Sequence, residues 1–128
     1  MIYTIGYGGM KSIDELKTVI KDEKKGIELL FDVRSKPLSR RVIFNRAYLE
    51  KEFAWCYRWQ GLTLGGMAPI AESSIKDLAN RSAAILLMCA EKDPAKCHRH
   101  YDIAVRLLKY GVVCIHLFDG KEIPADKL

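Results

Sequence analysis

Short runs of apolar residues alternate along the chain with segments in which apolar residues recur every three or four positions. Continuous runs of about four to eight residues are typical of buried strands, and the wider spacing is typical of amphipathic helices. Strands are therefore predicted at residues 2–5, 27–33, 56–59, 84–89 and 112–117. Helices are predicted at residues 13–24, 46–53, 74–81 and 94–110.

Capping residues mark several of these helix ends. Ser12 followed by Glu15 has the spacing of a capping box, and Gly26 ends the segment behind it. Asp93-Pro94 combines a preferred N-cap residue with a preferred first helical residue, and Gly111 follows the last helix. The helical segments are thus separate elements between strands.

Strands that alternate with helices imply right-handed crossovers between parallel strands and helices on both faces of the sheet. The predicted fold is an α/β three-layer sandwich with a mainly parallel sheet of about five strands. A length of 128 residues with no repeat or linker predicts a single domain over residues 1–128.

Chemically unusual residues follow the predicted strands. Gly6-Tyr7-Gly8 follows the first strand, Asp32 and Arg34 stand at the end of the second, and Cys89 ends the fourth. Ligands of open parallel sheets bind beyond the carboxyl ends of the strands. We therefore expect a site at that edge, centred on the segment 89–99.

The charge balance predicts an anionic ligand. The chain carries 21 basic and 16 acidic residues, a net charge of +5, and five of the basic residues lie in the segment from Asp32 through Arg46. Guanidinium groups hold phosphate or carboxylate through paired hydrogen bonds, and backbone N–H groups before a helix can assist. The predicted anion-binding residues are Arg34, Arg40, Arg99, Gly6, Tyr7 and Gly8.

Four cysteines, at positions 56, 89, 97 and 114, and the start of the chain bear on location. No secretory signal pattern and no apolar run of about 18 residues is present, so export and membrane insertion are not expected. We expect a cytoplasmic protein with reduced thiols.

A set of motifs spread over nearly the whole chain resembles the domain-of-unknown-function 488 family. The matching segments are Thr4-Ile5-Gly6-Tyr7-Gly8, Asp32-Val33-Arg34 with Pro37 and Ser39-Arg40, Phe44-Asn45, Leu64-Gly65-Gly66, and Cys89 to Pro94 with Cys97-His98-Arg99. The resemblance implies a fold and a set of signature residues, but no established activity. The tract before Leu64 departs from the family pattern, so the resemblance assigns no role to Tyr57.

The cysteine segment has three interpretations. In the first, Cys97 or Cys89 is a nucleophile: a helix start and basic neighbours favour a Cys97 thiolate, and Cys89 lies at the strand end. His98 or His100 would be its base, and Glu91 or Asp32 the orienting group. In the second, Cys89, Cys97 and His98 bind a metal. We do not predict a metal site, because the adjacent residues Cys97 and His98 would point about 100° apart on a helix and no fourth ligand is evident. In the third, the segment binds an anion and the cysteines pack. Cys97 is assigned to the core, on one helical stripe with Tyr101, Ala104 and Leu108.

These observations predict an anion- or phosphate-binding site at the carboxyl edge of the sheet. If the protein is an enzyme, its substrate is a nucleotide, nucleic acid or other anion, and Asp32, Glu91 or His98 supplies the acid–base function. Two alternatives stay open. One is a non-catalytic nucleotide- or nucleic-acid-binding module that stacks bases on Tyr7, Tyr48, Tyr57 or Trp59; the other is a thiol-dependent enzyme using Cys89. The sequence assigns neither a cofactor nor an oligomeric state.

Overall fold

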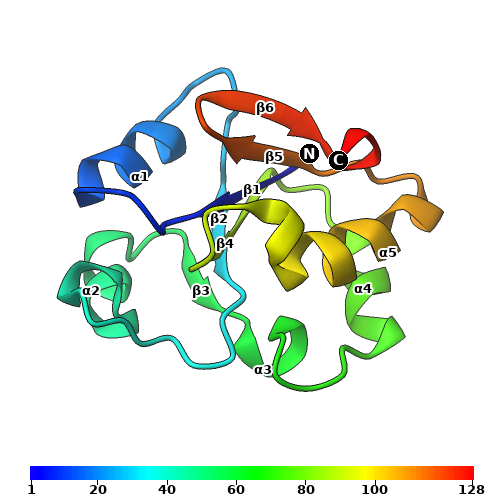
Figure 1. Cartoon of the computed structure of the whole chain (residues 1–128), viewed down its shortest axis with the longest axis horizontal. Helices are drawn as coiled ribbons and strands as arrows, with labels where there is room; N and C mark the ends of the chain where they lie inside the picture. The colour runs from blue at the N-terminus through cyan, green and yellow to red at the C-terminus, as the bar shows by residue number, and fades with distance from the viewer.

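The computed structural model describes all 128 residues and contains one six-stranded sheet (Figure 1). Its strands are β1 (Ile2–Gly6), β2 (Leu29–Asp32), β3 (Tyr57–Trp59), β4 (Ile85–Cys89), β5 (Ile115–Phe118) and β6 (Lys121–Pro124), in the order β3-β2-β4-β1-β5-β6. Every pairing is parallel except that of β5 with β6. The predicted α/β class with a mainly parallel sheet is confirmed, with six strands in place of about five.

Helices lie on both faces of this sheet. They are α1 (Ile13–Ile20), α2 (Arg46–Glu52), α3 (Gly61–Leu64), α4 (Glu72–Ala79) and a last helix that starts with a π-helical run, Arg99–Ala104, and continues through α5 (Val105–Leu107) to a 3₁₀ turn, Leu108–Tyr110. Further 3₁₀ turns span Val42–Phe44, Pro94–Lys96 and Ala125–Lys127. None of these helices has both the length and the apolar composition needed to cross a bilayer.

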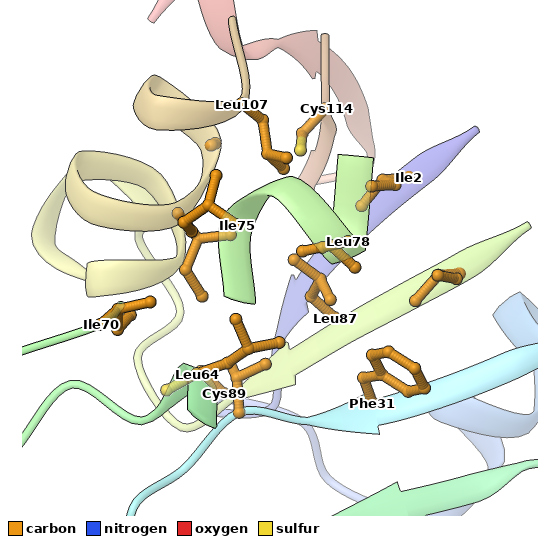
Figure 2. Close-up of a cluster of buried hydrophobic side chains, with 14 of the residues drawn as sticks. Ile2, Phe31, Leu64, Ile70, Ile75, Leu78, Leu87, Cys89, Leu107 and Cys114 are labelled. Atoms are coloured by element: carbon orange, nitrogen blue, oxygen red, sulfur yellow. The ribbon is translucent and has the colours of Figure 1, made fainter. Parts of the chain in front are cut away.

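Two apolar cores follow from the alternation of side chains along the strands. In β4, Ile85, Leu87 and Cys89 face one core, and Leu86 and Met88 face the other. The first core packs against α3, α4 and the last helix, and the second against α1 and α2. Figure 2 shows Leu64 and Cys89 together at one end of the first core. The cysteine that ends β4 is therefore part of a packed layer as well as of the sheet edge.

The helix predicted over residues 94–110 is interrupted. Cys97 has an extended backbone, with φ −123° and ψ 144°, between the turn at Pro94–Lys96 and the helix that begins at Arg99. The proposed stripe through Tyr101 is wrong, since that side chain is 61% exposed. Cys97 is buried as expected, but because of the break and not because of helical periodicity.

The sixth strand was not predicted. β6 pairs with β5 across Asp119-Gly120, two residues with positive φ angles of 51° and 71°. Asp-Gly is a preferred pair for a two-residue hairpin turn, so the sequence did contain a signal for this strand.

Candidate functional site

A groove of about 350 Å³ lies at the carboxyl edge of the sheet. The register places Gly6 beside Cys89 and Asp32 beside Met88, so the ends of β1, β2 and β4 meet there. The groove is lined by Tyr7, Arg34, Ser35, Lys36, Leu38, Gly66, Met67, Cys89, Ala90, Glu91, Lys96, Cys97, His98 and Tyr101. Three basic side chains and one acidic side chain thus stand around two thiols and an imidazole.

Cys89, Cys97 and His98 form a buried cluster in the wall of this groove. Their two sulfur atoms and one ring nitrogen lie within 4.8 Å of one another, and Cys97 Sγ is 3.8 Å from His98 Nδ1. Cys89 arrives from the end of β4, whereas the other two residues come from the break before the last helix. Because Cys97 is extended, its side chain and that of His98 converge. The divergence expected from a continuous helix does not occur.

The ring of His98 is held from its far side. Its Nε2 atom lies 3.1 Å from the carbonyl oxygen of Val33 and 2.9 Å from that of Leu64. Carbonyl oxygens only accept hydrogen bonds, so Nε2 carries a proton and Nδ1 faces the sulfur atoms. Gly66 makes room for the ring: a methyl group on this glycine would come within 2.7 Å of His98 Cγ.

The two thiols of the cluster differ in acidity. The neighbouring Cys89 thiol, aided by His98 and the Arg99 N–H and opposed by burial, lowers the pKa of Cys97 through its contact with the Cys97 sulfur. The same contact and burial raise the pKa of Cys89. Burial alone raises the pKa of the core thiols Cys56 and Cys114, to about 11 and about 12. Cys97 is thus the most acidic of the four thiols, and the pKa of Cys89 is shifted in the opposite direction.

Arg34 is anchored by Asp32 beneath the groove. Its Nε and Nη2 atoms donate to the two oxygens of Asp32 at 2.8 and 2.7 Å, and Nη1 donates to the Tyr7 hydroxyl at 3.0 Å. Tyr57 donates a further bond of 2.5 Å to Asp32. Asp32 is fully buried and does not line the groove, so its carboxylate holds Arg34 in place. Burial opposes the charge of Arg34, but the bonds to Asp32 raise its pKa overall.

Arg99 is fully buried and binds the loop that follows β4. It donates to the carbonyl oxygens of Glu91 at 2.6 Å and Lys92 at 3.1 Å, and its Nε donates to Thr4 Oγ1 at 3.2 Å. The guanidinium therefore fixes the backbone beside Cys89 and does not line the groove. Arg40 is exposed and also lies outside the groove lining. Of the three arginines expected to share one anion site, only Arg34 lines it.

The Gly6-Tyr7-Gly8 segment packs against the same loop. The N–H groups of Tyr7 and Gly8 donate to the carbonyl oxygens of Cys89 and Ala90 at 3.0 and 2.8 Å. A methyl group on Gly6 would come within 1.7 Å of the Glu91 carbonyl oxygen. These residues bring two loops into close contact. Because the N–H groups of Tyr7 and Gly8 already donate to carbonyl oxygens, they are not free to bind an anion as expected. The Glu91 carboxylate is exposed, lines the groove and accepts from the Asp93 N–H at 3.1 Å.

Behind the cluster, two further polar side chains are buried in neighbouring strands. Thr4 in β1 stands opposite His116 in β5, with Oγ1 and Nδ1 2.5 Å apart, and His116 Nε2 lies 3.0 Å from His100 Nδ1. Because Arg99 donates to Thr4, the Thr4 hydroxyl proton is left for His116. Burial, with the neighbouring His100 and Arg99, lowers the pKa of His116 to about 4.

The sequence analysis gave no role in the site to His116 or to the carbonyl groups of Val33 and Leu64. Thr4 and Gly66 lie in the segments that resemble the family but were given no role of their own, and Tyr57 was named only as a possible stacking residue. A polar residue within each of the apolar runs 2–5 and 112–117 was the available signal for the Thr4–His116 pair. The carbonyl contacts had none, since any residue type supplies a carbonyl.

Comparison of the chain with models of known protein families, with curated proteins and with solved structures finds no match.

Proposed function

We propose that the groove is the active site of a small enzyme that binds an anionic, phosphate-bearing substrate. The observation that carries the proposal is the placement of Arg34, Lys36 and Lys96 around the buried cluster of Cys89, Cys97 and His98. Perturbed, buried titratable groups beside a concave surface are typical of catalytic sites. An excess of positive charge around them favours an anion.

The residues have separable roles in this proposal. Asp32 positions Arg34, which retains guanidinium N–H groups for a substrate anion beyond its bonds to Asp32 and Tyr7. Lys36 and Lys96 are exposed and attract the anion from solution. Glu91 is the acid–base group, because its carboxylate alone among the predicted acidic candidates lines the groove.

Exposed apolar side chains at the rim support an organic substrate over a free inorganic ion. Leu38 and Met67 are each 71% exposed and Tyr101 is 61% exposed, and all three line the groove. A nucleotide combines phosphate with a flat apolar base that such side chains contact well. We therefore favour a nucleoside phosphate as substrate.

A non-catalytic nucleic-acid module has less support. Tyr7 is buried and stacked on Phe44, and Tyr57 is buried against Asp32. Trp59 lies under Arg46, at 4.8 Å from the guanidinium carbon to the ring centroid. These aromatic faces are occupied by protein groups, so they do not form an open stacking platform.

All four thiols are free, which fits the reducing cytoplasmic location that we propose.

Titration with inorganic pyrophosphate and with nucleoside phosphates, followed by amide NMR shifts, tests the anion site. Lys36→Ala and Lys96→Ala should each weaken binding about two- to fivefold, the range of exposed ion pairs. Lys76→Ala, an exposed lysine on α4 outside the groove, is the matched control and should leave the affinity unchanged. Equal affinities for all three variants would exclude the groove as the anion site.

The catalytic part of the same experiment uses turnover of the nucleoside phosphates. Glu91→Gln should lower the turnover number by roughly 10²–10⁴-fold while leaving substrate affinity within a few fold, as expected for loss of an acid–base group. Binding without turnover across the series would identify a binding module instead.

A further inference from the structure

We infer that Cys89, Cys97 and His98 form a binding site for a thiophilic divalent metal ion, above all Zn²⁺. This inference deepens the proposed function, because it supplies the enzyme's cofactor at the wall of the substrate groove. It reverses the expectation, drawn from helical geometry, that these residues do not ligate together.

The distances suit a tetrahedral metal ion. Zinc binds sulfur at about 2.3 Å and imidazole nitrogen at about 2.0 Å, so neighbouring ligand atoms in a tetrahedron lie about 3.5–3.8 Å apart. Cys97 Sγ and His98 Nδ1 are 3.8 Å apart, and the complete set lies within 4.8 Å. For all three atoms to ligate one ion, no separation has to close by more than about 1 Å.

The contacts of His98 are those of a metal-bound histidine. Its Nε2–H donates to the carbonyl groups of Val33 and Leu64, which leaves the Nδ1 lone pair for the cluster. Metal-ligating histidines commonly donate their other N–H to a carbonyl or carboxylate, which fixes the ring and its tautomer. His98 is only 8% exposed, so this arrangement is built into the packed structure.

The surrounding charges select the type of metal. Arg34, Lys36 and Lys96 oppose any cation in the groove, and Arg99 lies beneath it. Binding therefore depends on two thiolates, which form as the ion displaces two thiol protons. Soft sulfur ligands favour zinc over magnesium or calcium, which prefer oxygen.

Three protein ligands leave a fourth position, and all three line the groove. An open position of this kind is typical of catalytic zinc sites, where water or a substrate oxygen completes the tetrahedron. Glu91 lines the same groove and is the nearest acidic group in sequence to Cys89. The metal would thus adjoin both the anion-binding lysines and the acid–base residue.

Metal binding is tested on the full chain after removal of bound metal with a chelator. Zinc titrated against a chromophoric chelator should bind with one ion per chain. Co²⁺ in its place should give sulfur-to-metal charge-transfer absorption at an intensity expected for two thiolates. Cys89→Ala and Cys97→Ala should each halve that absorption, and each should weaken zinc binding by more than about 100-fold, beyond the usual effect of an outer contact.

Cys56→Ala is the matched control, because Cys56 is also a buried cysteine but packs in the other core, away from the groove. It should bind zinc as the wild type does, and circular dichroism of every variant checks the fold. Sub-stoichiometric binding by the wild type, or undiminished binding by Cys89→Ala or Cys97→Ala, would overturn the metal site. Pyrophosphate binding by the zinc-free protein tests the anion groove separately, so either proposal can fail alone.

Discussion

Arg34 and Arg99 are both buried, and their positive charges are compensated by different groups. Arg34 faces the carboxylate of Asp32, so the two ions neutralise each other. Arg99 has no carboxylate partner and is held by carbonyl oxygens of the loop after β4 and by Thr4. Charged residues are almost never fully buried without such partners. Arg34 lines the groove, whereas Arg99 stabilises the loop that forms part of the groove wall.

Replacement of Asp32 by Asn tests the first of these pairs. The variant keeps the side-chain shape but leaves the charge of Arg34 buried without a counter-ion, and such a change costs about 3–5 kcal/mol. Urea denaturation should show this loss of unfolding free energy. Asp77→Asn, at an exposed position on α4, should change stability by less than about 0.5 kcal/mol. Similar stabilities for the two variants would mean that the pair is not holding the site together.

Among the elements, the segment between β4 and the last helix has the greatest effect on the site. Asp93 caps the turn at Pro94–Lys96, as the Asp-Pro pair predicts, with its side chain accepting from the Ala95 N–H at 3.0 Å. The chain then becomes extended at Cys97 before the helix begins. This single break gives Cys97 and His98 a common direction, which a continuous helix would prevent.

The β5–β6 hairpin offers a test at the level of an element. Gly120 has a φ of 71° and no neighbouring atom that an added methyl group would meet. Gly120→Ala should therefore destabilise only through backbone strain, by about 1–2 kcal/mol in thermal or urea unfolding. Gly120→Asn should cost less, because asparagine adopts the left-handed region more readily. Equal losses for the two variants would contradict strain as the cause.

Across the whole molecule, the sheet separates two apolar cores, and a chain of hydrogen-bonded polar side chains is buried beside one of them. Thr4 and His116 occupy buried positions on adjacent strands, and His100 continues their hydrogen bonds toward the surface. Because His116 is held neutral inside the fold, global stability depends on pH.

Stability should fall on acidification between about pH 6.5 and pH 4. In this window the unfolded chain binds a proton at His116, with its ordinary pKa of 6.5, whereas the folded chain does not until about 4. The contribution lost is up to about 3 kcal/mol. Urea unfolding of the wild type and of His116→Gln at several pH values measures it. The raised pKa of His98 acts in the opposite direction, so the difference between the two proteins isolates His116. Parallel pH profiles would refute this assignment.

Local patterns in the sequence were sufficient for the fold class and for bringing most residues of the candidate site to one edge of the sheet. The apolar run 84–89 predicted the central strand, and the order of strands and helices predicted parallel pairing. The rule that ligands bind beyond strand ends led us to expect the segment 89–99 at the same edge as Arg34, and residues of both do line one groove. The β6 strand was missed although Asp119-Gly120 marked its turn.

The sequence by itself determined which elements form and which edge of the sheet carries the unusual residues, because periodicity and capping act over a few neighbouring positions. Only the tertiary structure decided the role of each side chain there. It placed Arg99 under the loop and Arg34 in the groove, left Arg40 outside, and brought Cys97 and His98 to Cys89 through a break in the helix. Those outcomes depend on contacts between residues distant in the chain and on backbone carbonyl groups, which residue types do not encode locally.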